Sequence, residues 1–112
     1  MENKDVFLIE TILDYCGRIE STMERFGLDH DKFVTDGQMQ DLCAFYCLQI
    51  GEYANELSDK LKDSHPEIEW HRIRGLRNII AHDYGSTNVE LLWTILVENI
   101  PELRDFCAKL IK

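Results

Sequence analysis

Apolar residues recur at spacings of three and four along most of this chain, which is the period of α-helices that bury one face. The clearest stretch runs from about residue 4 to residue 26 and predicts a first long helix. Its apolar positions form two interleaved seven-residue repeats, Ile9, Cys16 and Met23 with Ile12, Ile19 and Phe26. Gly27 is typical of a helix end, and residues 28–34 are expected to form a connector.

A second long helix is predicted from about residue 38 to residue 61. Thr35-Asp36-Gly37-Gln38 has the form of a capping box at its start, and Ser64-His65-Pro66 ends the segment. Its apolar side is made of Met39, Cys43, Tyr46, Ile50, Tyr53, Leu57 and Leu61. We expect this helix to lie antiparallel to the first. Gly51 disfavours a helix by about 1 kcal/mol relative to Ala, so its presence indicates that another backbone approaches closely there.

Further helices are predicted in the second half of the chain. The third spans about residues 69–84, the fourth opens at Thr87-Asn88-Val89-Glu90 and runs to Asn99, and Pro101 suits the first turn of a short fifth helix. The apolar residues of the fourth helix are Val89, Leu92, Trp93, Leu96 and Val97. In the fifth helix we expect these residues to face inward: Leu103, Phe106, Cys107, Leu110 and Ile111. No segment shows sustained two-residue alternation, so we expect no strands. The pattern predicts an all-α, up-and-down bundle of four to five helices in one domain, residues 1–112, with the first three helices forming the core.

Length and cysteine positions narrow the class of protein. A chain of 112 residues suits one domain, and no apolar run approaches the roughly 18 residues of a membrane span. Its N-terminus lacks the order of a signal peptide, so we expect a cytoplasmic protein with no membrane partner. The cysteines occupy apolar helix positions and are expected to be core residues: Cys16, Cys43, Cys47 and Cys107. His30, His65 and His71 are expected to be loop or surface residues, and we predict no metal and no cofactor.

The run from Gly75 to Tyr84 holds most of the candidate chemistry. On a helix with about 100° per residue, one side collects the apolar residues Ile73, Leu76, Ile79 and Ile80. The other side collects Arg74, Asn78 and His82, which follow one another at four-residue spacing. This helix is therefore expected to have a packed side and a polar side.

Positive charge is concentrated beside this run, although the net charge of the chain is −9 at pH 7. Arg72, Arg74 and Arg77 are half of the six arginines, and no acidic residue lies between His71 and His82. Such a patch in an acidic protein can bind one phosphate, whereas the acidic remainder argues against a protein that coats nucleic acid. Arg72 and Arg74 are therefore candidates for substrate binding. The alternative is that both form ion pairs with acidic residues of neighbouring helices.

The sequence Arg77-Asn78-Ile79-Ile80-Ala81-His82-Asp83-Tyr84 resembles the signature of HepT-like proteins in the HEPN superfamily. That signature is Arg-x4-His, with Asn directly after the Arg and Tyr two residues after the His. The flanks are similar as well, at Ile50-Gly51-Glu52, Pro66-Glu67-Ile68, Leu92-Trp93 and Ile100-Pro101-Glu102-Leu103. The resemblance extends from about residue 35 to the C-terminus and implies a HEPN-like helical fold, typically dimeric.

The resemblance implies a metal-independent endoribonuclease, and the residues suit that chemistry. RNA carries its own nucleophile, the 2′-OH, so cleavage needs proton transfer and stabilisation of charge on the phosphoryl group. His82 is expected to be the acid/base, Arg77 to bind the phosphate and Asn78 to orient groups through hydrogen bonds. Arg77 and His82 point about 140° apart around a regular helix, so a single copy does not aim both at one phosphate. The resemblance implies a homodimer in which the signature helices of two subunits face each other across a shared cleft.

The resemblance also implies a biological setting. HepT-like proteins act as toxins in a type II or type VII-like toxin–antitoxin pair, beside an MntA-like nucleotidyltransferase antitoxin that transfers AMP to the signature tyrosine, here Tyr84. Two alternatives stay open. One is a non-catalytic module whose cationic notch binds a nucleotide or a partner peptide. In the other, Arg77 is only a paired ion, His82 a residue at a helix end and Tyr84 a half-buried aromatic.

Overall fold

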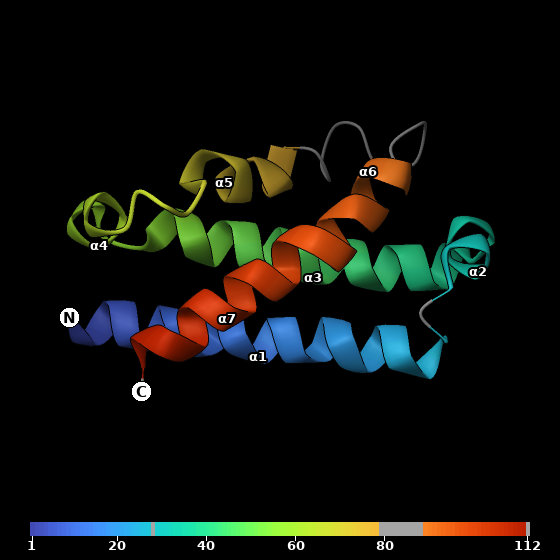
Figure 1. The fold of residues 1–112 in the computed structure, drawn as a ribbon, viewed down its shortest axis with the longest axis horizontal. Coiled ribbons are helices and arrows are strands. Elements are labelled where there is room, and N and C mark those ends of the chain that lie inside the picture. Colours follow the sequence, from blue (N-terminus) through green and yellow to red (C-terminus); the bar gives the residue numbers. More distant parts are fainter. Residues whose placement is uncertain (28, 79–88, 112) are drawn as a thin grey trace.

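Two long antiparallel helices run the length of the molecule. In this computed structural model, which describes residues 1–27, 29–78 and 89–111, α1 (Asn3–Arg25) and α3 (Gly37–Glu56) lie side by side in opposite directions (Figure 1). The predicted apolar stripes explain the contact, since these residues on the two helices are fully buried: Ile9, Ile12, Cys16, Ile19, Cys43, Cys47 and Ile50. The predicted antiparallel pair is confirmed.

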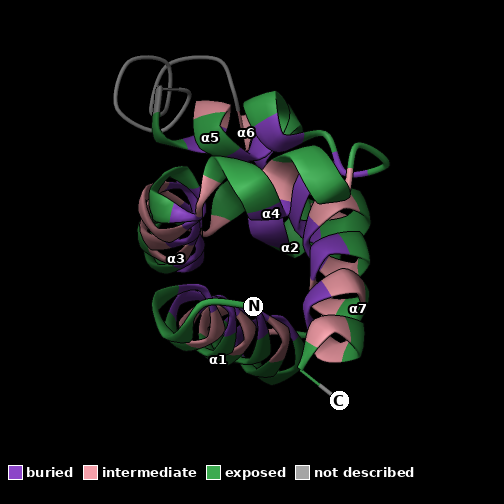
Figure 2. Ribbon diagram, turned by 90° about the vertical axis from the view of Figure 1, so that its left-hand side faces the viewer, coloured by how far each residue is buried: buried purple, intermediate pink, exposed green. Residues whose placement is uncertain are grey.

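The remaining helices complete the bundle. α5 (Trp70–Asn78) packs on α3, and α6 (Val89–Thr94), the π-helical segment η2 (Ile95–Asn99) and α7 (Ile100–Leu110) follow one another along the chain. The buried residues of α1, α3, α5 and α7 lie on the sides of these helices that face the middle of the bundle (Figure 2). The described ranges contain helices and turns but no strand, which confirms the all-α prediction. Within the same ranges, no helix has the length and apolar character needed to cross a bilayer.

The connector predicted after the first helix contains a short helix, α2 (His30–Thr35). The Asp29 side chain caps it by accepting hydrogen bonds from two backbone N–H groups of its first turn, which have no partner within the helix. The capping residue of the next helix also differs from the prediction. Asp36, not Thr35, is the N-cap of α3, and its carboxylate accepts a hydrogen bond from the backbone N–H three residues later at 3.0 Å.

The second long helix ends at Glu56, before its predicted end at residue 61. Ser58 has an extended backbone, and a separate helix, α4 (Asp59–Ser64), begins after it. The cause is a contact with α1. The buried carboxylate of Asp5 accepts hydrogen bonds from the Ser58 backbone N–H at 2.9 Å and from the Ser58 hydroxyl at 2.6 Å. A serine held in this way caps a new helix instead of continuing the old one, and apolar spacing does not reveal such a contact.

The predicted fourth and fifth helices form one continuous helical path. The backbone stays in the helical region at both ends of η2, with φ −58° and ψ −43° at Thr94 and φ −66° and ψ −45° at Ile100. Pro101 lies in the first turn of α7, as predicted. The wider turn of a π-helix changes which side chains face inward. Val97 is 37% exposed. Ile111, which was predicted to face inward, lies beyond the last residue of α7 and is 39% exposed.

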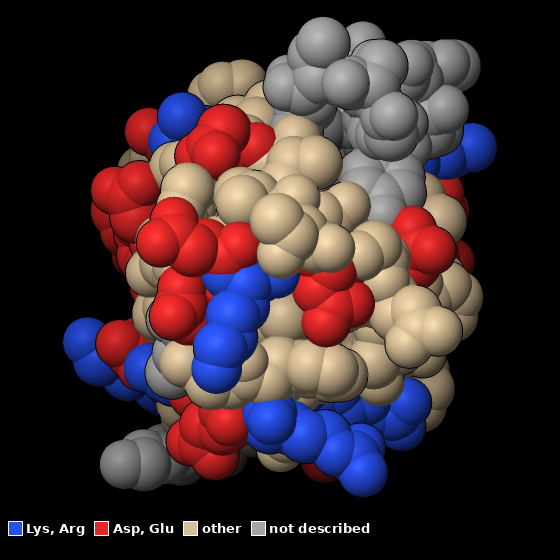
Figure 3. Space-filling model, turned by 90° about the vertical axis from the view of Figure 1, so that its right-hand side faces the viewer, with Lys and Arg blue, Asp and Glu red and all other residues tan. Residues whose placement is uncertain are grey.

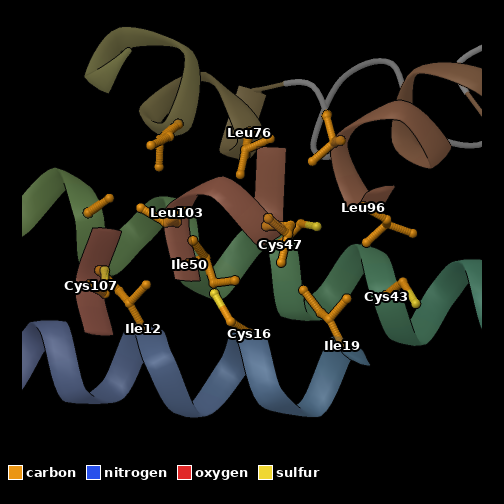
Figure 4. Close-up of a cluster of buried hydrophobic side chains, with 14 of the residues drawn as sticks. Ile12, Cys16, Ile19, Cys43, Cys47, Ile50, Leu76, Leu96, Leu103 and Cys107 are labelled. Atoms are coloured by element: carbon orange, nitrogen blue, oxygen red, sulfur yellow. The ribbon is translucent and has the colours of Figure 1, made fainter. Parts of the chain in front are cut away.

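All four cysteines are unpaired thiols buried in the core, as predicted. Burial raises the pKa of Cys16 and Cys107 to about 12 and that of Cys43 to about 11, so these thiols stay protonated at neutral pH. Figure 4 shows them among isoleucine and leucine side chains from the surrounding helices. Among the residues the structure describes, no group of three or more His, Cys, Asp or Glu is arranged to hold a metal ion.

The core extends beyond the three helices predicted to form it. Leu96 of η2 and Leu103 of α7 are each 2% exposed and point into the same cluster as the residues of α1 and α3 (Figure 4). α7 packs against α1, whereas α5 has its main contact with α3. The helix that carries the start of the signature run is therefore held from one side, and its outer side is accessible.

Candidate functional site

α5 lies directly against α3 at Gly51. A Cβ atom at Gly51 would be 3.2 Å from the backbone nitrogen of Arg77 and 3.3 Å from the carbonyl oxygen of Ile73, which is tighter than most side chains tolerate. The glycine therefore allows the two helix backbones to meet, as its place within a helix predicted. Leu76 is buried beside this contact, and Arg77, the next residue, faces outward.

Arg77 stands at the edge of α5 that faces α3. Its guanidinium Nε lies 2.6 Å from Oε1 of Glu52, and the two side chains are 60% and 42% exposed. An exposed ion pair of this kind contributes about 0–1 kcal/mol, so Glu52 orients Arg77 without preventing it from binding another anion. The contact uses Nε, and the Nη groups of a guanidinium can then donate to two oxygens of one phosphate. The sequence singled out Glu52 only as part of a similar flank.

The other two clustered arginines have different surroundings. Nη1 of Arg72 lies 3.2 Å from Oε2 of Glu69, so its acidic partner is three residues earlier and not on a neighbouring helix. Arg74 has no acidic side chain within ion-pair distance in the described part of the chain. Arg74 and Arg77 line the same groove, whereas Arg72 borders a separate cavity between α5 and α7. Of the two candidates for substrate binding, Arg74 is the one on the Arg77 side of α5.

The groove between α3 and α5 has a volume of about 280 Å³. Its lining residues come from both helices and are mostly polar: Gly51, Asn55, His71, Arg74, Gly75 and Arg77. Sequence reasoning did not select Asn55, and it placed His71 at the surface, where it does lie. In the sequence, Gly51 was the feature that could have indicated Asn55. The residue one turn after a glycine that touches another helix borders the same contact, which points to Asn55.

Several predicted positions lie outside the described residues. They are Ile79, Ile80, His82, Tyr84 and the first half of the capping box at residues 87 and 88. Asn78 is the last residue of α5, and only its backbone is described. The placement of His82 relative to Arg77 therefore stays a prediction.

Two histidines outside the signature have packing contacts. Nε2 of His30 lies 2.8 Å from Oε2 of Glu90, and the pKa of His30 is raised mainly because this carboxylate accepts a hydrogen bond from the ring. The His30 ring also meets Trp93 edge-on, with 5.3 Å between ring centroids. His65 meets Phe106 in the same way at 5.1 Å. These rings join α2 to α6 and the end of α4 to α7, in keeping with the predicted loop and surface positions.

Charges are mixed on the end of the molecule that α2 and α6 form. Figure 3 shows several Asp and Glu side chains around a basic side chain in the middle of this face, with more Lys and Arg along its lower edge. A face with this much negative charge is a poor surface for an RNA backbone. The α3–α5 groove, which contains two arginines and borders the C-terminal half of α3, is the better candidate for contact with a polyanion.

Comparison with known proteins identifies the class of protein to which the chain is similar. The family model described as "Ribonuclease HepT-like" matches residues 12–110. A relative named "Putative RNase" in Caldanaerobacter subterraneus subsp. tengcongensis is 29% identical over 96 residues, which cover 85% of this chain and 83% of the relative. Another protein of that name in Methanocaldococcus jannaschii is 26% identical over 106 residues, covering 93% of this chain and 94% of its own. "Probable ribonuclease HepT" of Thermococcus cleftensis is 35% identical over 63 residues, covering 56% and 57%. No solved structure gives a significant match.

Proposed function

The chain belongs to the HepT-like ribonuclease family, and from this we propose that it is a metal-independent endoribonuclease with Arg77, Asn78 and His82 at its active site. The observation that carries the proposal is the family match over residues 12–110, which includes the whole signature run. Relatives named as ribonucleases support the same activity. The outward position of Arg77 beside the α3–α5 groove makes its guanidinium accessible to a large substrate.

The proposed reaction uses a nucleophile that belongs to the RNA. The 2′-oxygen forms a bond to the adjacent phosphorus while the bond to the 5′-oxygen breaks, which leaves a 2′,3′-cyclic phosphate and a 5′-hydroxyl. His82 takes the proton of the 2′-OH or supplies one to the leaving 5′-oxygen. A free imidazole has a pKa of about 6.5, so both of its forms are present near neutral pH.

Arg77 would stabilise the negative charge that develops on the phosphoryl oxygens during this reaction. Because Glu52 engages Nε, the guanidinium is oriented before the substrate arrives, and a preoriented donor stabilises developing charge more effectively than a mobile one. Asn78 follows Arg77 directly and would orient the substrate or His82 through its amide group. These roles need no metal ion.

We also propose that the active enzyme is a homodimer. On a regular helix, residues five apart point about 140° away from each other, so the proposed site uses two copies of the signature run to bring Arg77 and His82 to one phosphate. The outer side of α5, which carries Arg74 and Arg77, is exposed and available to face a second copy. Each shared site would then combine Arg77 of one subunit with His82 of the other.

Mixing two inactive variants tests this arrangement. Arg77→Ala and His82→Ala, combined in equal amounts after unfolding and refolding together, should recover about a quarter of wild-type cleavage, because half of the dimers are mixed and each mixed dimer has one intact site. The recovered rate is measured against each variant refolded alone. Failure to recover cleavage, or a wild-type mass that stays at 13.2 kDa at micromolar concentration, would contradict the shared site.

The biological role that we propose is that of a toxin. The partner would be a separate MntA-like nucleotidyltransferase that acts as antitoxin and adds AMP to Tyr84, two residues after the proposed acid/base. An added AMP would place a bulky anion near Arg77, where it competes with RNA for the guanidinium. Membership of the family and the position of Tyr84 in the signature run support the proposed control.

Cleavage without metal is the direct test of the proposed activity. The purified protein should cut single-stranded RNA at the same rate with and without EDTA, and it should leave a 2′-O-methyl copy of the same sequence intact, because that copy lacks the nucleophile. Gel electrophoresis of end-labelled strands measures both. Loss of cleavage on adding EDTA would refute metal independence. Binding of RNA without any cleavage would favour the non-catalytic module instead.

A further inference from the structure

The α3–α5 groove has the composition of a nucleotide-binding surface. Arg74 and Arg77 lie one helical turn apart on α5, so their Cβ atoms are about 5–6 Å apart and both guanidinium groups border the groove. Arg77 is oriented by Glu52, whereas Arg74 has no acidic partner among the described residues. One arginine is therefore assigned to the scissile phosphate by the proposed function, and the other remains for a neighbouring phosphate.

The other side chains that line the groove can contact the base of an RNA nucleotide. The imidazole of His71, one turn before Arg74, is exposed and offers a flat ring of the kind on which unpaired RNA bases stack. The amide of Asn55 on α3 is exposed across the groove and can both donate and accept hydrogen bonds. Nζ of Lys62 lies 3.5 Å from the carbonyl oxygen of Asn55 and adds positive charge at this end of the groove.

Two glycines keep the groove open and shallow. Gly51 lets α5 lie against α3, which brings Asn55 close to the polar side of α5. Gly75 is on the α5 wall, and a Cβ atom built there would meet nothing within 4 Å. The space above Gly75 is therefore free for a ligand, and a side chain introduced at this position would occupy that space without a clash.

We propose that this groove holds the nucleotide next to the cleaved bond, with Arg74 binding its phosphate and His71 and Asn55 contacting its base. The inference rests on the proposed ribonuclease function and adds a second binding position to it. Its ligand is single-stranded RNA, since a duplex would not present an unstacked base to His71. Arg74, His71 and Asn55 bind and position the substrate and take no part in proton transfer.

Binding of an uncleavable strand tests the groove separately from catalysis. With a fluorescent 2′-O-methyl oligonucleotide, anisotropy should give a Kd about 10-fold higher for Arg74→Ala and about fivefold or more higher for His71→Ala. Gly75→Glu should raise Kd about 10-fold as well, because it puts a carboxylate into the open space. In Arg74→Ala the slope of log Kd against log salt should fall by about 0.7, the contribution of one phosphate contact to a single strand.

Two control variants make the same changes of charge, loss of an arginine and gain of a carboxylate, at positions distant from the groove. Arg25→Ala removes an exposed arginine at the end of α1, and Gly17→Glu adds a carboxylate to α1 where a Cβ atom also meets nothing within 4 Å. Both should bind within about twofold of wild type. If Arg74→Ala and Gly75→Glu also bind within twofold while wild type cleaves RNA, the groove assignment is wrong and the proposed function stands. If wild type neither cleaves RNA nor binds the oligonucleotide, the proposed function fails and the groove assignment fails with it.

Discussion

Replacing either signature residue with alanine is expected to stop RNA cleavage almost completely. Arg77→Ala removes the proposed donor to the developing phosphoryl charge and should lower the rate by about 10²–10³. His82→Ala removes the proposed acid/base and should lower the rate by about 10²–10⁴. Single-turnover rates at saturating protein measure the loss directly, because weaker binding does not affect them under that condition.

The Arg77 variant should fold normally. Its side chain is 60% exposed and its ion pair with Glu52 is worth about 0–1 kcal/mol, so circular dichroism and the midpoint of thermal unfolding should change little. Arg25→Ala, which removes an exposed arginine far from α5, is the matched control and should cleave like wild type. Cleavage at the wild-type rate by both signature variants would show that the active site lies elsewhere.

Loss of the tyrosine hydroxyl at position 84 should make the protein insensitive to the proposed nucleotidyltransferase antitoxin. Tyr84→Phe keeps the ring and removes the only atom of that side chain that can accept AMP, so the change in modification should be all or none. Co-expression of wild type with the proposed nucleotidyltransferase partner should add the mass of one or more AMP groups, and co-expression of Tyr84→Phe should add none. Mass spectrometry of the intact protein distinguishes the two.

RNA cleavage provides a second test of Tyr84→Phe. Tyr84→Phe should cleave RNA as wild type does when expressed alone, and it should keep that activity in the presence of the transferase, whereas wild type should lose it. Tyr53→Phe, on α3, is a matched control that should still be modified. AMP found on Tyr84→Phe would place the modified residue elsewhere in the chain.

The helices could be predicted from the sequence because the apolar spacing that identifies a helix is a local property of the chain. A residue such as Ile12 or Ile50 is buried by the same spacing that makes its helix amphipathic, so apolar period alone predicts both the helix and its inner face. Gly51 went further. Glycine disfavours a helix, and the structure shows why one stands here, since a Cβ atom would lie only 3.2 Å from the backbone nitrogen of Arg77.

The ends of the helices depended on contacts that the local pattern does not contain. The second helix stops where Asp5, more than fifty residues earlier, binds the backbone and hydroxyl of Ser58. The exposure of Val97 follows from a π-helical turn, which shifts the side chains of η2 relative to a regular helix. In both places the long-range arrangement determines the local geometry.

The candidate site also has a part that the sequence predicts and a part that depends on the packing of the helices. The signature residues are contiguous, so the sequence brings Arg77 and Asn78 together without help from the fold. The groove joins Asn55 of α3 to His71 and Arg74 of α5, and only the packing of the two helices at Gly51 makes these residues neighbours. Glu52 of α3 likewise becomes a partner of Arg77 only because the two helices pack against each other.

The chemical nature of the RNA ends tests the central proposal most directly. RNA cut by the purified protein in EDTA should carry 2′,3′-cyclic phosphate and 5′-hydroxyl ends, because in the proposed mechanism the 2′-oxygen of the substrate is the nucleophile and His82 and Arg77 supply the catalysis. Mass spectrometry of a short synthetic RNA after cleavage identifies both ends. Products with 3′-hydroxyl and 5′-phosphate ends, formed only when a divalent metal is added, would contradict the proposed mechanism.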